Sequence, residues 1–133
     1  MSKLEIPLLH DHYAKWCIMN HVLDLYRHHL DLPDPDDEMR DEEGGLDVSF
    51  DPIYDSWVCA IKVTAHKANG EPCDFTHRQY HDIMQAMVYV EQELPNGFCF
   101  FEIYTGNSRT LDIRYAIDHN DSVREWYNFN IKK

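Results

Sequence analysis

The sequence has few basic residues and no long apolar run. Its 12 lysines and arginines stand against 24 aspartates and glutamates, which gives a formal net charge of −12. A surface this acidic repels phosphate groups, so we expect no direct binding of nucleic acid. No apolar stretch approaches the roughly 20 residues that cross a bilayer, and the first ten residues lack the continuous apolar stretch of a secretory signal. We therefore expect a cytoplasmic protein that does not enter a membrane.

Cysteine is also sparse, and no two cysteines form a Cys-x-x-Cys pair. Cys17, Cys59, Cys73 and Cys99 are 42, 14 and 26 residues apart, and each lies in apolar or β-prone sequence. Without an export signal, this spacing predicts free thiols that pack as small hydrophobic side chains rather than a disulfide framework.

The sequence is rich in acid over one short segment, residues 31–47. This segment holds nine carboxylates and one arginine, so it carries −8 of the net charge and leaves −4 for the other 116 residues. Its like charges repel one another, and two prolines and two glycines oppose a long helix or strand. We expect an exposed acidic loop on an otherwise ordinary domain, whose 17 aromatic residues argue against disorder.

Hydrophobic periodicity predicts the elements on either side of this loop. A wide apolar face, including Tyr13 and Trp16, indicates a helix over 8–30 that is buried under a sheet or against a second copy of the chain. Asn69-Gly70 predicts a type I′ hairpin, and Thr76 with Gln79 forms a capping box at the start of a second helix. Alternation predicts strands over 46–50, 57–66, 71–75, 98–104, 111–117 and 123–131, although Ser122 with Glu125 would also suit a short helix.

The resulting order is α-βββ-α-βββ within a single α+β domain over 1–133. Consecutive strands joined by short turns form antiparallel sheets, and two helices then cover one face. A homodimer is compatible with the wide apolar face of the first helix.

A metal site is the first chemical hypothesis that the sequence raises. His77 and His81 are four residues apart on the predicted helix, and Cys73 and His66 precede them. Zinc needs three or four such ligands, and the glutamate of a His-Glu-x-x-His hydrolase signature is absent. Asp34, Asp36 and Glu38 imitate the start of a calcium loop, but Met39 stands where glycine is required. We therefore expect no metal or other cofactor, and keep a metal-dependent hydrolase using His77, His81 and Cys73 as an alternative.

Nucleophilic catalysis has no support, because no serine lies in a Gly-x-Ser-x-Gly elbow and no cysteine has a recognisable activating neighbour. The sequence therefore favours a protein-binding protein over an enzyme. We expect an inhibitor or immunity-type protein, of the kind that viruses and mobile elements encode, that engages a basic, nucleic-acid-binding surface of its target. The residues expected to bind this partner are the loop carboxylates and two nearby aromatics, namely Asp34, Asp36, Asp37, Glu38, Asp41, Glu42, Glu43, Tyr54 and Trp57.

Small size, acidity and element order are similar, at the level of fold and charge, to three groups of binding proteins. These are toxin-immunity proteins, virus-encoded inhibitors and secretion chaperones, and no motif is shared with any of them. A dimeric secretion-type chaperone that holds an unfolded segment on an exposed sheet face is therefore a further alternative.

Overall fold

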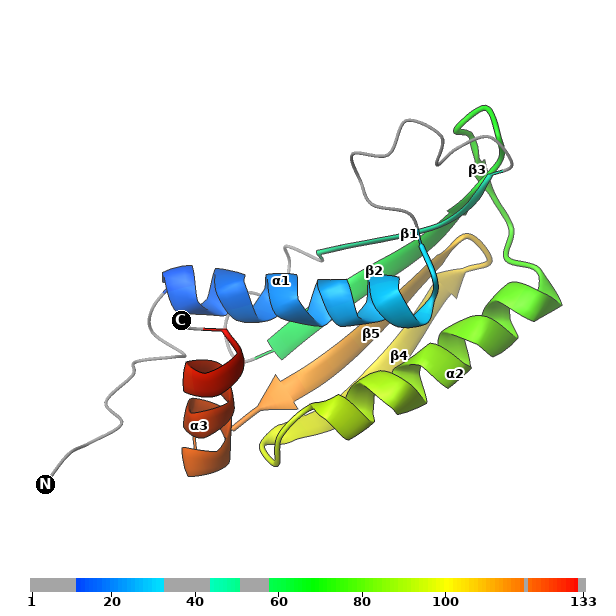
Figure 1. The fold of residues 1–133 in the computed structure, drawn as a ribbon. Coiled ribbons are helices and arrows are strands. Elements are labelled where there is room, and N and C mark those ends of the chain that lie inside the picture. The colour runs from blue at the N-terminus through cyan, green and yellow to red at the C-terminus, as the bar shows by residue number, and fades with distance from the viewer. Residues whose placement is uncertain (1–11, 33–43, 51–57, 119, 132–133) are drawn as a thin grey trace, which may run out of the picture.

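The chain folds around one antiparallel sheet with its helices on a single face (Figure 1). A computed structural model describes residues 12–32, 44–50, 58–118 and 120–131. The elements in chain order are α1 (His12–His29), β1 (Gly45–Phe50), β2 (Val58–His66), β3 (Pro72–Cys73), α2 (His77–Glu93), β4 (Phe98–Asn107), β5 (Thr110–Ile117) and α3 (Asp121–Asn130). The α+β class predicted from the sequence is confirmed.

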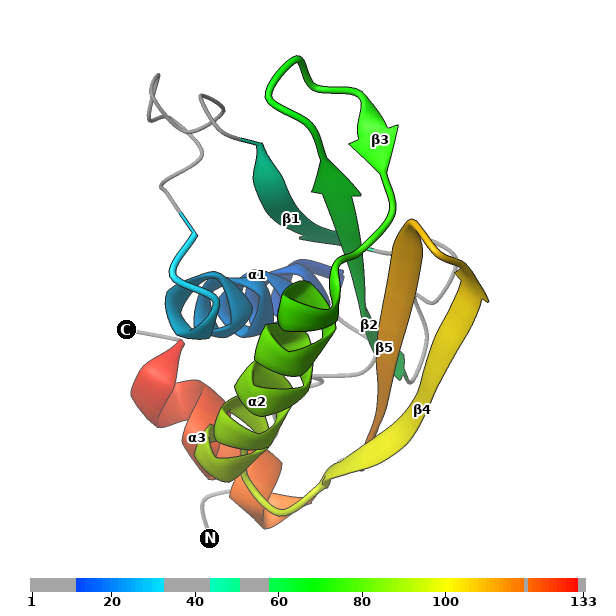
Figure 2. The same ribbon diagram turned by 90° about the vertical axis from the view of Figure 1, so that its right-hand side faces the viewer.

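The strands lie in the order β1-β2-β5-β4, and the short β3 also pairs with β2. Every pairing is antiparallel, and β1 and β4 form the two edges of this path. Figure 2 shows the sheet on one side and α1, α2 and α3 together on the other. The opposite face of the sheet, called the outer face below, carries none of the described helices.

The core lies between the sheet and the helices. Alternate residues of β2 and β5 point into it, which is why both strands show the two-residue apolar period. Almost fully buried side chains from the strands and helices fill this layer, including Cys59, Ile61, Val63, Leu111, Ile113, Tyr115, Ile18, Val22, Tyr26, Ile83 and Val90. Burying each large apolar side chain contributes about 1.5–3 kcal/mol before the entropy of ordering it is counted.

Two tyrosine hydroxyls meet inside this apolar layer. The hydroxyl oxygens of Tyr26 on α1 and Tyr115 on β5 are 2.5 Å apart, and both side chains are fully buried. Burial raises the pKa of Tyr26, and the nearby Tyr115 adds to the effect; burial also raises the pKa of Tyr115. Each hydroxyl therefore stays protonated, and one donates a hydrogen bond to the other.

The buried face of α1 differs from the predicted one. Ala14, Ile18 and Val22 are buried, whereas Tyr13 and Trp16, which we expected on the apolar face, are 68% and 56% exposed. Apolar and aromatic residues occur on more than one side of this helix, so the pattern did not fix which side meets the sheet.

The last predicted strand is wrong, because residues 121–130 form helix α3 and the element order is α-βββ-α-ββ-α. The Asn120 side chain caps the helix by accepting a hydrogen bond of 3.0 Å from the Val123 amide. Val123, Trp126 and Tyr127 are buried, and their three- and four-residue spacing is helical. Three helices, not two, therefore cover the sheet.

The capping box of α2 is confirmed, since Thr76 and Gln79 exchange side chain-to-backbone hydrogen bonds of 3.0 and 2.8 Å. The type I′ hairpin is wrong, because only Gly70, at φ +90°, has a positive φ in this turn. Lys67 accepts from the Gly70 amide and donates to the Glu71 carbonyl, so residues 68–70 form a three-residue loop with glycine in the left-handed position.

Residues 31–47 are only partly a loop. Gly45 to Asp47 belong to β1, which pairs with β2 from Gly45 opposite His66 onwards. Residues 33–43 lie outside the described residues.

All four cysteines are free thiols. Cys59 is buried, and Cys99 is exposed on the edge strand β4. Burial raises the pKa of the Cys59 thiol to about 12.

Candidate functional site

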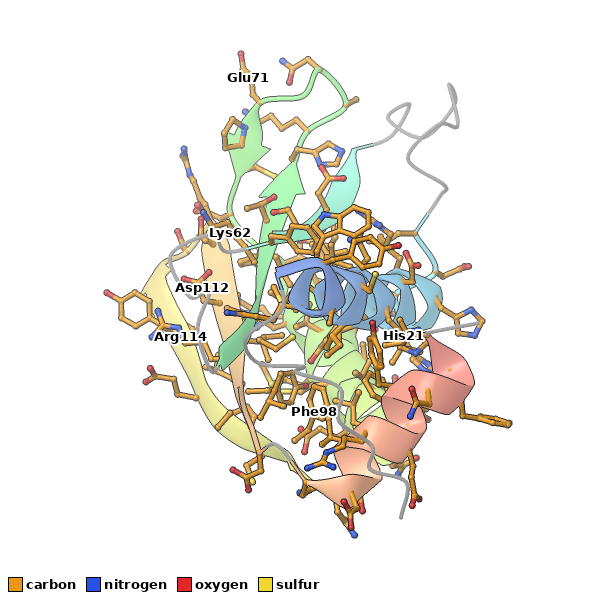
Figure 3. All side chains as sticks on the ribbon, turned by 90° about the vertical axis from the view of Figure 1, so that its left-hand side faces the viewer. His21, Lys62, Glu71, Phe98, Asp112 and Arg114 are labelled. Carbon is orange, nitrogen blue, oxygen red and sulfur yellow. The ribbon has the colours of Figure 1, made fainter. Side chains whose placement is uncertain are left out.

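The outer face of the sheet is polar, in contrast to the face under the helices. Residues opposite one another on neighbouring strands share a face, so the pairing register groups them into rows. The rows are Asp47–Thr64–Thr110, Ser49–Lys62–Asp112–Tyr104 and Ala60–Arg114–Glu102. Figure 3 shows Lys62, Asp112 and Arg114 on this side, away from α1 and α3.

An ion pair between Arg114 and Glu102 lies on the outer face. Arg114 donates to Glu102 over 2.6 Å and lies above the Tyr104 ring, 5.4 Å from its centroid. Its side chain is only 12% exposed. Because a charge this covered is costly without a partner, the pair with Glu102 holds Arg114 in place.

A pocket of about 400 Å³ opens at the upper end of the outer face, beneath the β2–β3 hairpin. Four strands and two turns contribute to its wall, through Asp47, Thr64, Ala65, His66, Gly70, Pro72, Arg109 and Thr110. This volume is at the lower end of the range for small-ligand pockets. Figure 3 locates the hairpin by Glu71, which follows Gly70 at the top of the view.

The charged groups of this pocket are paired within the fold. His66 Nδ1 lies 3.0 Å from Asp47 Oδ2. Arg109 Nε donates to Asp74 Oδ1 over 3.2 Å, and the Ser108 hydroxyl donates to the same oxygen over 2.8 Å. These hydrogen bonds, first from Ser108 and then from Arg109, lower the pKa of Asp74. Arg109 and His66 thus each lie beside a carboxylate of the fold.

The acidic segment rejoins the fold beside this pocket. Gly44, at φ +76°, packs so closely against the hairpin that a Cβ there would lie 2.6 Å from the His66 carbonyl oxygen. Only glycine tolerates both this φ and this approach. Asp41, Glu42 and Glu43 directly precede Gly44 in the chain.

The residues that we predicted to bind a partner all lie outside the described residues. They are Asp34, Asp36, Asp37, Glu38, Asp41, Glu42, Glu43, Tyr54 and Trp57. The structure instead brings together Asp47, which we had counted in the loop, with His66, which we had considered only as a metal ligand. Their pairing depends on the β1–β2 register, which the sequence does not show.

The alternative metal ligands are not brought together. Cys73 packs against the core, whereas His77 and His81 are exposed on α2 and His81 lies 3.3 Å from Asp82. Within the described parts of the chain, no group of three or more His, Cys, Asp or Glu side chains is arranged to hold a metal ion.

The aromatic side chains that the structure leaves exposed include a pair at the start of α1. The rings of Tyr13 and Trp16 stack with centroids 6.2 Å apart. A hydrogen bond with Cys17 raises the pKa of Tyr13. The pair lies near the start of α1, and neither residue lines the pocket.

Comparisons with protein-family models, curated proteins and solved structures find no match to this chain. None of the helices that the structure describes has both the length and the apolar character needed to span a membrane. Chemically, the pocket offers carboxylate and hydroxyl oxygens together with an arginine that is paired with Asp74. This combination suits recognition of a polar group, and it contains neither a metal-ligand set nor a serine or cysteine nucleophile among its lining residues.

Proposed function

We propose that this chain is a small acidic protein-binding protein that engages a basic, nucleic-acid-binding surface of its target through residues 33–43. The observation that carries the proposal is the charge of this segment, which holds seven carboxylates and one arginine between α1 and β1. An inhibitor or immunity-type role follows from such binding, since the bound chain would occupy the groove that nucleic acid uses.

The arrangement of arginines supports this proposal. Each arginine within the described residues pairs with a carboxylate of the fold; these are Arg27, Arg78, Arg109, Arg114 and Arg124. The strongest cations of the described fold are therefore already matched locally, mostly by residues close in sequence or on the next strand. Fewer cations of the described fold therefore remain to pair with the carboxylates of residues 33–43.

The outer face gives less support to the secretion-chaperone alternative. A face that holds unfolded segments needs exposed apolar surface, whereas the rows here contain Lys62, Asp112, Arg114 and Glu102. The hydrolase alternative has no ligand group among the described residues to build on. Neither alternative is developed further.

The proposal is tested with the full chain as bait in its native host's lysate, eluted at graded salt. We expect a basic partner that added duplex DNA or RNA displaces, because both ligands compete for one groove. The association rate of the purified pair should fall steeply with salt, while dissociation changes less.

Two matched variants distinguish an effect of the acidic segment from an effect of net charge alone. Neutralising Asp36, Asp37, Glu42 and Glu43 to Asn or Gln should slow association by about ten-fold or more at low salt. Neutralising Glu71, Glu91, Asp118 and Glu125, exposed residues elsewhere on the fold, changes the net charge equally and should have a much smaller effect. Equal effects of the two variants, or a partner that nucleic acid does not displace, would contradict the proposal.

A further inference from the structure

The geometry points to an apolar anchor for the proposed interaction, on which this inference rests: a basic partner protein buries Tyr89 and Val88 of α2 against apolar side chains of its own. Carboxylates speed the encounter of two such proteins, whereas buried aromatic side chains mainly set how slowly they separate. The partner therefore presents an apolar recess beside its cations.

An exposed stripe runs along the C-terminal half of α2. Gln85, Val88, Tyr89 and Gln92 follow one another at three- and four-residue spacing, so they share one side of the helix, and all four are exposed. Val88 and Tyr89 are 52% and 44% exposed. Two apolar side chains flanked by neutral glutamines resemble the centre of a protein interface, which is depleted of charge and enriched in tyrosine.

Contacts with α1 hold the Tyr89 ring in place. The His29 ring stacks on it, with centroids 5.4 Å apart and planes at 25°, and His29 Nε2 also bonds to Glu93, one turn further along α2. An imidazole donates to a carboxylate in its neutral and in its protonated form, so this contact does not depend on the charge of His29. A side chain that is already ordered loses less entropy on binding, which suits Tyr89 to the role of an anchor.

The charges around the stripe favour a basic partner. The sequence contains no lysine or arginine between Arg78 and Arg109, and α2 carries the exposed Glu91 and Glu93 in its last turn. The C-terminus of a helix also carries a partial negative charge. This end of α2 therefore complements a cationic surface.

Tyr89 is linked through His29 to the point where the chain leaves α1. His29 is the last residue of α1, and the two helices lie side by side (Figure 2). Beyond it, Asp31 adopts a left-handed φ of 56°, and the Leu32 amide donates to the Arg27 carbonyl over 2.9 Å. These features end the helix as a Schellman motif does and fix the chain up to Leu32, directly before the acidic segment. The anchor and the start of that segment therefore belong to one helix pair.

The experiment uses two peptides of equal charge as probes, Ac-KKLLKKLLKK-NH2 and Ac-KKSSKKSSKK-NH2, titrated into the full chain at low salt. Burial of one leucine side chain accounts for about a ten-fold gain in affinity, so we expect the leucine peptide to bind about ten-fold more tightly. We also expect this peptide, and not the serine peptide, to shift the backbone amide signals of Val88, Tyr89 and Gln92 in a nuclear magnetic resonance spectrum.

Four variants assign this leucine preference to the stripe. Tyr89→Ala should remove most of the preference while leaving the serine peptide's affinity within about two-fold, and Tyr89→Phe should retain the preference. Val88→Thr replaces a methyl group by a hydroxyl at nearly constant shape and should reduce the preference, which keeps the test valid if Tyr89→Ala perturbs the fold. Phe129→Ala, at a position 83% exposed on α3, is the matched control and should leave the preference unchanged.

Equal affinities for the two peptides, or a leucine preference that survives Tyr89→Ala, would overturn the anchor. Loss of the preference in Phe129→Ala, or amide shifts confined to β4, would place the apolar contact elsewhere and would overturn it as well.

Failure of this inference is distinguishable from failure of the proposed function. Neutralising Asp36, Asp37, Glu42 and Glu43 should weaken the binding of both peptides and leave the leucine preference unchanged. If it weakens neither peptide, the proposed function is contradicted, whereas the leucine preference and its loss in Tyr89→Ala report on the anchor alone.

Discussion

The same strands form both faces of the sheet, but the two faces have different roles. Residues of β2 and β5 that point toward the helices, such as Ile61 and Ile113, are fully buried in apolar contacts. Their immediate neighbours Lys62, Asp112 and Arg114 point outward into rows of charges and hydroxyls. The first face supplies stability through burial, and the second offers groups that another molecule could recognise.

The difference indicates where substitutions should matter for folding and where for binding. Ion pairs at a surface contribute little to stability, because solvent screens them and long side chains must be ordered. Burial of apolar area contributes far more for each residue. Stability therefore depends mainly on the covered face, and the exposed positions of the outer face can be altered to probe function with little loss of stability.

The largest effect should come from truncating a core residue of β5. Ile113→Ala removes a fully buried side chain opposite Ile61 on one neighbouring strand and Ile103 on the other, and should lower the free energy of unfolding by about 3 kcal/mol. Urea denaturation followed by circular dichroism measures this change. A loss below about 1 kcal/mol would show that the core repacks or that this face is less covered than described.

The buried tyrosine pair should give an intermediate and coupled effect. Tyr26→Phe and Tyr115→Phe each leave one buried hydroxyl without its 2.5 Å partner, and each should cost about 1–2 kcal/mol. The double substitution removes both hydroxyls and should cost about 1 kcal/mol less than the sum of the single changes. Additive costs in this double-mutant cycle would mean that the two hydroxyls do not bond to each other.

The smallest effect should come from the outer face. Glu102→Gln weakens the 2.6 Å contact with Arg114 and should cost about 0.5–1 kcal/mol, a loss that shrinks in high salt. Glu71→Gln, at an exposed position of the hairpin, is the matched control and should change stability by less than about 0.5 kcal/mol. If Glu102→Gln lowered the free energy of unfolding as much as Ile113→Ala does, the two faces would not differ in their contribution to stability.

Elements with strong local signals could be predicted from the sequence. The Thr76–Gln79 capping box and the alternation of Cys59, Ile61 and Val63 each fix structure within a few residues, and both are confirmed. Helix α3 was missed because residues 123–131 fit both periods: Val123 and Tyr127 are two residues of an alternating strand and also one turn apart on a helix. The signal that decides between them is Asn120, whose side chain caps the helix.

The candidate site could not be predicted in the same way. Asp47, His66 and Arg109 come from three places in the chain, and they meet only because β2 pairs with β1 on one side and β5 on the other. Such pairings are long-range, so no window of sequence contains them. Composition did identify the acidic segment, but not the hairpin against which its end at Gly44 packs.

The irregular edge of the sheet has a consequence for how the chain behaves at high concentration. β4 is ten residues long and contains three phenylalanines, so a regular edge of this kind would template pairing between molecules and lead to aggregation. The register shifts between Phe100 and Glu102 and between Tyr104 and Asn107 interrupt the edge, and Glu102 places a charge in its middle. Near pH 5.0, where the net charge vanishes, colloidal repulsion is lost. The irregular shape of β4 then still opposes pairing of this edge with another sheet.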